Sequence, residues 1–219
     1  MSEIAAKLES QLGRRIALHE SLTTHTTLQQ NTIAQYYLEV DTIDSLVQAV
    51  NAARTLGLPL FILGSGSFIS LPDETILGLV IKNNCRRFDK ISMKGKIQGQ
   101  EVGVEEVLVQ AESGTLMNQL VRFTIEEGLS GLEYFLGLPG TVGGALYTDV
   151  KYKNYAVRDC LKALRVLNAE GKIEMLTQDF NRGLSDGILL SAVFQLKPMD
   201  KKLLWERGSE AGESRNKNN

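Results

Sequence analysis

The sequence has 219 residues, of which 43% are hydrophobic and 23% are charged, and its formal net charge at pH 7 is −2. A chain of this size can bury a substantial core as one or two domains, and its small net charge gives no electrostatic reason to expect a nucleic-acid partner. No basic segment followed by an apolar one opens the chain, and no apolar run reaches membrane-spanning length. We therefore expect neither a signal peptide nor a membrane partner.

The cysteines and histidines give no sign of a metal site. Cys85 and Cys160 are far apart, and neither has a Cys or His at the spacing of metal ligands. His19 and His25 are separated by a polar stretch and have no such neighbours either. We expect two free thiols in a reducing compartment, which makes the cytoplasm the expected location.

Helical and strand periods alternate along the chain. The expected elements are, in order, an amphipathic helix within residues 1–19, a strand at 34–40, a helix from Asp41 or Thr42 to Gly57, strands at 58–63, 77–82, 90–98 and 106–111, a helix at 115–127, a hairpin of strands 160–168 and 172–177, and a strand at 188–196. Gly57 and Gly128 follow the two later helices, where a glycine commonly ends a helix. Frequent hairpins among helices favour an α+β fold over a doubly wound parallel sheet.

The same pattern predicts four segments. Residues 1–33 form an N-terminal helix and lead-in, residues 34–112 a first lobe and residues 113–198 a second lobe. Residues 199–219 are mostly polar and charged, and we expect them to be a disordered tail.

Two glycine segments are the candidate functional sites. Gly64-Ser-Gly-Ser67 directly follows a buried strand, and such a turn either leads into the next strand or aims backbone N–H groups at an anion. It lacks the Lys of a phosphate-binding P-loop and the third glycine of a dinucleotide fingerprint. Residues 127–145 contain six glycines and Pro139 among apolar residues. This composition favours either a tightly packed crossover or backbone shaped around a large ligand held by main-chain donors.

These segments resemble a known enzyme family. The motifs Gly64-Ser-Gly-Ser67, Ala111-Glu-Ser-Gly114 and Gly137-Leu-Pro-Gly-Thr-Val-Gly-Gly-Ala145 occur in the order found in UDP-N-acetylenolpyruvoylglucosamine reductases, also called UDP-N-acetylmuramate dehydrogenases. The resemblance runs from about Leu18 to Pro198. It implies a two-lobed FAD-binding domain of the p-cresol methylhydroxylase/vanillyl-alcohol oxidase type.

The resemblance also implies an activity. Members of the family are flavoprotein oxidoreductases of peptidoglycan precursor synthesis, and thus of cell-wall biogenesis and cell shape. They use NADPH to reduce FAD, and reduced FAD then reduces UDP-N-acetylglucosamine enolpyruvate to UDP-N-acetylmuramate. The implied partner is therefore a small UDP-sugar, and the sequence does not indicate an oligomeric state.

By position, the resemblance assigns residues to the cofactor. The loop residues would donate to the FAD phosphates, and the later glycine segment would lie beside the ribityl chain and the flavin ring. The implied FAD contacts are Gly64, Ser65, Gly66, Ser67, Gly114, Leu138, Pro139, Gly140, Thr141, Val142, Gly143 and Gly144. Arg182 is either the catalytic arginine of the family or a solvated loop residue.

The sequence departs from the family pattern in several places. Phe68 replaces the Asn that usually follows the first glycine loop, and residues 146–153 lack the glycines found there in the family. The third domain of the family would begin near Pro198, where we expect only the polar tail. A second hypothesis is therefore open, in which the chain is a degenerate or truncated member that binds FAD, or only keeps the fold, and acts as a non-catalytic binding module.

Overall fold

A computed structural model describes residues 3–67, 69–98, 101–178 and 180–217. The chain forms two compact units, Met1–Cys85 (unit 1) and Arg86–Asn219 (unit 2). The sequence placed the boundary between the lobes at residues 112 and 113, which is wrong. Residues 107–112 pair with residues 191–196 in the sheet of unit 2, so the strand that contains them belongs to the second unit and not to the first.

Unit 1 is a four-stranded mixed sheet with two helices and a short 3-10 turn. Its elements are α1 (Glu3–Leu12), β1 (Ala17–Ser21), η1 (Thr23–His25), β2 (Ile33–Val40), α2 (Ile43–Thr55), β3 (Leu60–Leu63) and β4 (Thr75–Asn83). The strand order is β1-β2-β4-β3. β1 runs antiparallel to β2, whereas β4 runs parallel to both β2 and β3. The core of the unit includes Leu22, Tyr37 and Val80.

Local sequence explains most of these boundaries. Thr42 caps α2, because its hydroxyl accepts a hydrogen bond from the Ser45 N–H at 3.2 Å. Gly57 has φ +63°, the left-handed conformation with which helices commonly end. The helix predicted within residues 1–19 is confirmed as α1. Gly13, also at φ +63°, follows it, and the lead-in after Gly13 enters β1 at Ala17.

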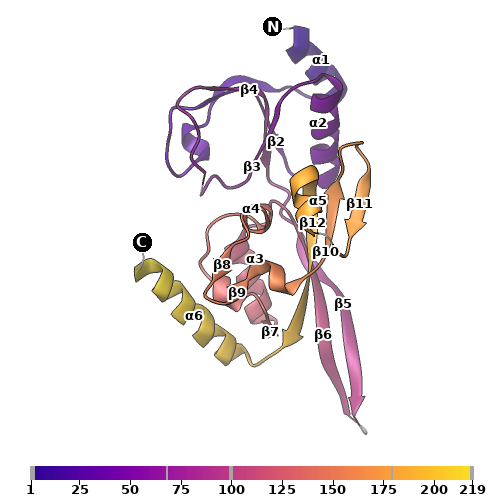
Figure 1. Ribbon diagram of the computed structural model, residues 1–219, viewed down its shortest axis with the longest axis vertical. Coiled ribbons are helices and arrows are strands. Elements are labelled where there is room, and N and C mark those ends of the chain that lie inside the picture. The colour runs from indigo at the N-terminus through magenta and orange to yellow at the C-terminus, as the bar shows by residue number, and fades with distance from the viewer. Residues whose placement is uncertain (1–2, 68, 99–100, 179, 218–219) are drawn as a thin grey trace. The chain divides into compact units, whose positions relative to one another are not determined.

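Unit 2 is built on a long antiparallel sheet. Its elements are β5 (Phe88–Gln98), β6 (Glu101–Glu112), α3 (Met117–Glu126), β7 (Leu129–Ser130), η2 (Glu133–Phe135), α4 (Val142–Tyr147), β8 (Lys151–Tyr152), β9 (Tyr155–Ala156), η3 (Val157–Cys160), β10 (Leu161–Leu167), β11 (Ile173–Leu176), α5 (Phe180–Asp186), β12 (Ile188–Pro198) and α6 (Lys201–Lys217). The sheet order is β11-β10-β12-β6-β5, with β7 paired to β12. Figure 1 shows β5 and β6 extending as a two-stranded arm.

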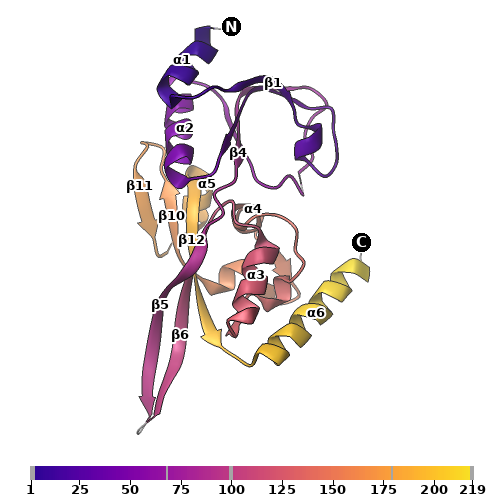
Figure 2. The same cartoon turned by 180° about the vertical axis from the view of Figure 1, so that it is seen from behind.

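The core of unit 2 lies between this sheet and the helices α3 and α4. The side chains of Met117, Leu120, Phe135, Val142 and Phe194 are almost completely buried there. Figure 2 shows α3 and α6 on one side of the strands. The predicted hairpin is confirmed, since β10 and β11 pair antiparallel across a turn in which Gly171 has φ +78°. Over the described residues, no helix is long and apolar enough to span a membrane.

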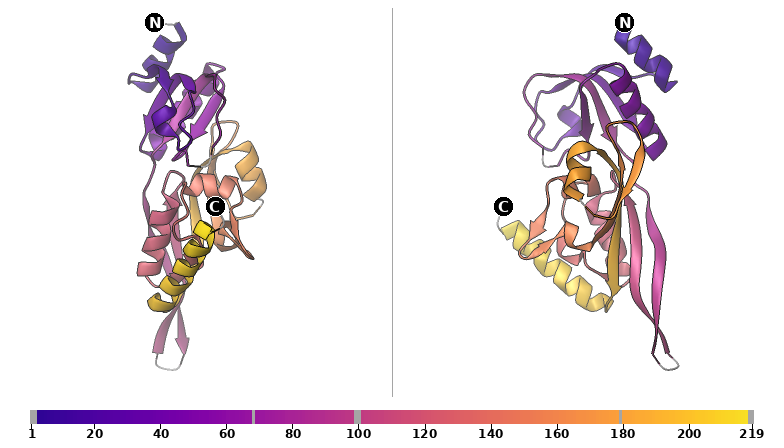
Figure 3. Two further views of the ribbon diagram at one scale, coloured as in Figure 1. Left: turned by 90° about the vertical axis from the view of Figure 1, so that its left-hand side faces the viewer. Right: turned by 45° about the vertical axis from the view of Figure 1, so that its right-hand side comes forward.

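The predicted disordered tail is wrong, because Lys201–Lys217 forms the helix α6 (Figure 3). Asp200 precedes the helix, and its carboxylate accepts a hydrogen bond from the Leu203 N–H at 3.0 Å. Leu204 and Ala211 are buried, and a Cβ on Gly208 would lie 3.0 Å from the Leu136 side chain. The buried face of α6 is narrow and consists of positions 204, 208 and 211. Most other residues of the helix are polar, which is why its composition resembles that of a disordered tail.

Candidate functional site

The loop Gly64–Ser67 follows β3 in unit 1 and packs tightly against the chain around His25. Gly66 is buried and has φ +73°, and a Cβ at this position would lie 2.1 Å from the His25 carbonyl oxygen. The Thr27 N–H donates a hydrogen bond to the Gly66 carbonyl at 3.0 Å. Only glycine fits here, because any side chain would require the backbone of one segment to move.

Serine hydroxyls lie on both sides of Gly66. The Ser65 and Ser67 hydroxyl oxygens are 2.8 Å apart and hydrogen-bonded, and both residues are partly exposed. Phe68, which replaces the usual Asn of the family, lies outside the described residues. The loop therefore offers two hydroxyl groups around a closely packed glycine, a composition suited to binding the oxygen atoms of an anion.

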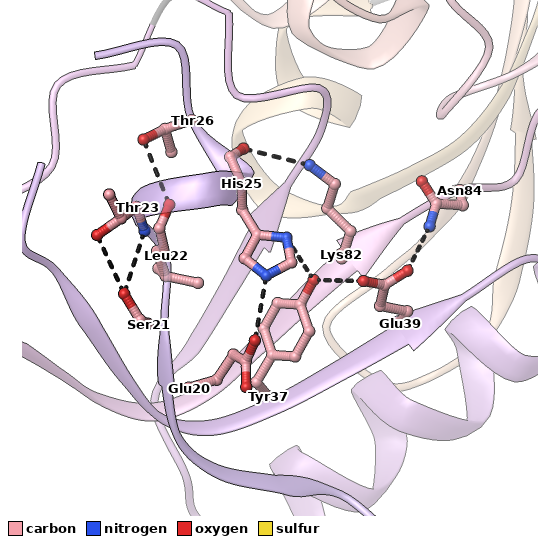
Figure 4. Close-up of polar contacts among 10 residues, drawn as sticks. All are labelled: Glu20, Ser21, Leu22, Thr23, His25, Thr26, Tyr37, Glu39, Lys82 and Asn84. Atoms are coloured by element: carbon pink, nitrogen blue, oxygen red, sulfur yellow. Dashed lines mark hydrogen bonds and ion pairs between the residues drawn. The ribbon is translucent and has the colours of Figure 1, made fainter. Parts of the chain in front are cut away.

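A network of polar side chains surrounds His25 (Figure 4), whose carbonyl lies against Gly66. The His25 imidazole is between Glu20 and Tyr37, with its Nε2 3.3 Å from Glu20 Oε1 and its Nδ1 3.1 Å from the Tyr37 hydroxyl. That hydroxyl donates to Glu39 Oε1 at 2.8 Å. Burial, together with the hydrogen bond to Glu39, raises the pKa of Tyr37 well above its ordinary value. The sequence did not reveal this network, since its members are spread over β1, η1 and β2.

The glycine-rich segment of unit 2 is fixed mainly by backbone hydrogen bonds. The N–H groups of Val142 and Gly143 each donate at 2.8 Å, to the carbonyls of Thr115 and Ser113. The Met117 N–H donates to the Gly140 carbonyl at 3.0 Å. Residues 113–117 and 140–143 are thus joined side by side. This brings the predicted contact Gly114 close to the predicted contacts Gly140–Gly143.

Within this segment, α4 begins at Val142 with Thr141 as its N-cap, a feature that the sequence did not predict. The Thr141 hydroxyl caps the helix by accepting a hydrogen bond from the Gly144 N–H at 3.2 Å. A Cβ on Gly143 would lie 3.0 Å from the Ser113 carbonyl oxygen, so α4 approaches the end of β6 closely. Leu138 and Val142 are buried and anchor the segment, whereas Pro139 and Gly144 are exposed.

Gly137 and Gly140 provide open space rather than close packing. They have φ values of +78° and +112°, and no atom lies within 4 Å of the position of an added Cβ. The Gly137 N–H donates to Asn118 Oδ1 at 2.8 Å, which ties the start of the segment to α3. The main chain at Gly137 is therefore bonded to α3 on one side. On the side where Cβ atoms of Gly137 and Gly140 would project, there is open space.

Helix α6 adds a second support, which the sequence also did not reveal. The Arg215 guanidinium donates to the carbonyl of Tyr134 at 2.6 Å and to that of Leu136. Burial lowers the pKa of Arg215 from its ordinary value. The Tyr134 ring stacks on Tyr155 with ring centroids 3.8 Å apart, and the hydrogen bond between them, reinforced by burial, raises the pKa of Tyr134 to about 12.

The structure distributes the predicted site residues over both units. Gly64, Ser65, Gly66 and Ser67 lie in unit 1, whereas Gly114, Leu138–Gly144 and Arg182 lie in unit 2. Arg182 is part of α5, which packs on β10 and β12, but its side chain is outside the described part of the structure. Among the described residues, no group of three or more His, Cys, Asp or Glu side chains has an arrangement suited to a metal ion.

The glycine segments match a known family model, which is described as an FAD binding domain and covers residues 34–177. The chain belongs to this family of FAD-binding domains. The match includes Gly64–Ser67 as well as Gly137–Gly144, and it confirms the resemblance inferred from these motifs and the FAD-binding fold inferred with it.

Curated relatives carry the name of a reductase. UDP-N-acetylenolpyruvoylglucosamine reductase of Desulforamulus reducens is 30% identical over 178 residues, which are 81% of this chain and 55% of the relative. The enzyme of the same name from Exiguobacterium sibiricum is 31% identical over 170 residues, covering 78% of this chain and 52% of the relative. The chain thus spans about half the length of these relatives.

Solved structures show the same fold. UDP-N-acetylenolpyruvylglucosamine reductase of Thermus caldophilus aligns with a TM-score of 0.67 at 24% identity, over 92% of this chain and 70% of that one. A VAO-type flavoprotein of Myceliophthora thermophila aligns with a TM-score of 0.66 at 15% identity, over 90% of this chain and 47% of that one. At these identities the likeness concerns the fold alone.

The residues present fit FAD, the cofactor of the family. A Cβ on Gly66 would collide with the His25 carbonyl, and a Cβ on Gly143 would make a tight contact with the Ser113 carbonyl, so glycine suits both positions. Ser65 and Ser67 supply hydroxyl donors suited to a diphosphate. Gly137 and Gly140 leave the main chain open on one side, as a flat ring system approached by backbone requires.

Proposed function

We propose that this chain is the FAD-binding part of a reductase that uses NADPH to convert UDP-N-acetylglucosamine enolpyruvate to UDP-N-acetylmuramate, in the cytoplasm. The observation that carries the proposal is the family match over residues 34–177, which includes both glycine segments. The names of the relatives from Desulforamulus reducens and Exiguobacterium sibiricum supply the substrate class.

The residues of the chain would hold the cofactor through main-chain and hydroxyl groups. We assign the FAD diphosphate to Gly64–Ser67, where Ser65 and Ser67 provide donors. We assign the ribityl chain and flavin ring to Gly114 and Leu138–Gly144, where buried Leu138 and Val142 fix the backbone and help to exclude water. When bound, FAD supplies hydride transfer, from NADPH to the enolpyruvyl double bond of the UDP-sugar.

Arg182 is our candidate for the catalytic side chain. A guanidinium keeps its charge at every pH of interest and can stabilise the negative charge that develops beside the enolpyruvyl group during reduction. Its place in α5 puts it in unit 2, the unit that also holds Leu138–Gly144.

Anaerobic rapid-mixing spectroscopy tests the proposal in two steps. We expect NADPH to bleach the visible flavin absorption of the FAD-loaded protein, and we expect added UDP-N-acetylglucosamine enolpyruvate to restore it. FAD-loaded protein whose flavin NADPH does not reduce would contradict the proposed reaction. A flavin that NADPH reduces but that the UDP-sugar does not reoxidise would contradict the proposed substrate.

The variant Arg182→Ala tests the catalytic assignment. We expect reoxidation by the UDP-sugar to slow by about 10²-fold, the typical effect of removing one group that stabilises a transition state, with FAD affinity unchanged. Arg15→Ala removes an exposed arginine of unit 1 and serves as the control. Equal reoxidation rates in the two variants would remove Arg182 from the site.

A further inference from the structure

The loop Gly64–Ser67 packs against the main chain of His25. Its carbonyl oxygen is the atom closest to the position of a Cβ on Gly66, at 2.1 Å, and the Thr27 N–H binds the Gly66 carbonyl at 3.0 Å. The Lys82 Nζ donates to the same His25 carbonyl at 3.4 Å. Any shift of the His25 backbone would therefore move Gly66, because the two segments have no free space between them.

The side chain of His25 ties this backbone to two neighbouring strands. Figure 4 shows its ring between Glu20 of β1 and Tyr37 of β2, with the carbonyl turned toward Lys82 of β4. The imidazole and the Tyr37 ring are also in contact, with centroids 4.8 Å apart. Asn84 Nδ2 donates to the second oxygen of Glu39 at 3.0 Å, which fixes the carboxylate at the far end of the network.

The protons in this network can be counted. A tyrosine hydroxyl has one proton, and Tyr37 uses it to donate to the Glu39 carboxylate at 2.8 Å. Its oxygen therefore accepts a hydrogen bond from His25 Nδ1. Ionised carboxylates only accept, so Glu20 requires a proton on His25 Nε2 as well. Both ring nitrogens carry protons when all these bonds are formed.

We propose that His25, as an imidazolium between Glu20 and Tyr37, is a positioning residue that keeps the Gly64–Ser67 loop in the shape that binds the FAD diphosphate. When the imidazole loses a proton, one nitrogen presents a lone pair to an oxygen lone pair, and one of its two hydrogen bonds is lost. FAD affinity is then higher in the protonated form and falls as pH rises. This inference rests on the proposed binding of FAD.

Titration of the whole chain with FAD across a pH series measures this effect. From about pH 5.5 to about pH 8, carboxylates and tyrosines in their ordinary ranges keep their charge, whereas histidines titrate. The diphosphate and the flavin ring of FAD also keep their charge. We expect the Kd for FAD to rise about tenfold over this interval, the effect of one charge-assisted hydrogen bond.

Two histidine variants provide the matched comparison, since His19 and His25 are the two histidines of the chain. In His25→Gln we expect a Kd that no longer depends on pH and that equals the high-pH value of the wild type. His19 is exposed and has φ +52°, so His19→Asn, which tolerates this conformation, is the control and should keep the wild-type profile. A His25→Gln protein with the wild-type pH profile would overturn the proposal.

A second measurement needs neither a variant nor FAD. Nitrogen-15 NMR of the wild-type chain should show protons on both ring nitrogens of His25 at about pH 5.5 and a shift of the Gly66 amide signal as His25 titrates. A singly protonated His25 ring at that pH, or a Gly66 amide that ignores the titration, would overturn the proposal. Failure to bind FAD at any pH would instead refute the proposed function and leave the NMR result to decide the role of His25.

Discussion

The two glycine segments are supported in different ways. In unit 1, Gly64–Ser67 packs on the backbone of His25. The His25 ring lies between Glu20 of β1 and Tyr37 of β2, and its carbonyl accepts from Lys82 of β4. In unit 2, the segment Gly137–Gly144 is joined to residues 113–117 by main-chain hydrogen bonds at 2.8–3.0 Å. We therefore expect the first segment to respond to charge and pH. The second segment is held mainly by main-chain hydrogen bonds, and Arg215 supports the residues just before it.

This contrast explains why glycine substitutions should have unequal effects. A glycine that touches a carbonyl of another segment cannot be replaced without moving backbone. A glycine that only adopts a left-handed conformation can be replaced at a moderate cost. Two glycines without a close backbone contact serve as controls, Gly57 in unit 1 and Gly144 in unit 2.

The largest effect is expected for Gly66→Ala. The new Cβ would lie 2.1 Å from the His25 carbonyl oxygen, and Ala would have to adopt φ +73°. Strain of about 3 kcal/mol predicts a rise of more than about 100-fold in the Kd for FAD. Flavin fluorescence during titration measures it. Gly57→Ala has a similar φ, +63°, with no atom within 4 Å, and should leave the Kd unchanged. An unchanged Kd in Gly66→Ala would refute the role of the close packing.

Gly143→Ala tests the second segment. Its Cβ would lie 3.0 Å from the Ser113 carbonyl, so we expect the free energy of unfolding to fall by about 1–3 kcal/mol, as for overpacking elsewhere. In Gly144→Ala the nearest atom is 3.5 Å away, and alanine in a helix should raise stability by a few tenths to about 1 kcal/mol. Urea denaturation measures both. Equal stabilities would contradict the close approach of α4 to Ser113.

Arg215→Ala tests the support from α6. Loss of the two hydrogen bonds to the carbonyls of Tyr134 and Leu136 should lower the free energy of unfolding by about 1–2 kcal/mol. Hydrogen exchange should increase in residues 133–136 while α3 keeps its protection. Lys202→Ala, at an exposed position of α6, is the control. Unchanged exchange in Arg215→Ala would show that the end of α6 does not hold the segment.

The last prediction concerns Cys160, which lies outside both glycine segments. Burial, with Glu133 and Asp159 nearby, raises the pKa of this thiol from 9.0 to about 11. A thiol whose pKa is higher by two units has about 100-fold less thiolate near pH 8. Alkylation of Cys160 should therefore be about 100-fold slower than that of a free cysteine. The reaction is followed by mass spectrometry in a Cys85→Ala background. Alkylation at the rate of a free cysteine would contradict the burial.

The same shift affects stability in alkaline solution. A raised pKa in the folded state means that the contribution of Cys160 is fully present below about pH 9 and is lost as pH rises toward about 11. Cys160→Ser removes this titration and should flatten that part of the pH profile. An identical loss in both proteins would assign the alkaline destabilisation to other groups.

Local sequence predicted much of this fold. The helix capped by Thr42, the hairpin closed at Gly171 and the strand after residue 187 were confirmed, since each depends on neighbours in the sequence. Helix α6 was missed, because its buried positions are few and most of its residues are polar. The boundary at Cys85 was missed because it follows from the pairing of β6 with β12, about 80 residues later.

The candidate site was predictable only in its glycine segments. Glycine patterns are read directly from the sequence, and the family match includes them. The network of Glu20, His25, Tyr37 and Glu39 was not predictable, because a lone histidine in a polar stretch has no local signal for its partners on other strands. The assignment of individual FAD contacts and of Arg182 stays a prediction.

Titration of the purified chain with FAD, followed by flavin absorbance and fluorescence, tests the central claim most directly. We expect saturation at one FAD per chain, with a yellow complex that persists through gel filtration. Gly66→Ala should fail to form this complex under the same conditions, because its loop would be displaced from His25. A wild-type chain that is folded by circular dichroism but binds no FAD would contradict the account.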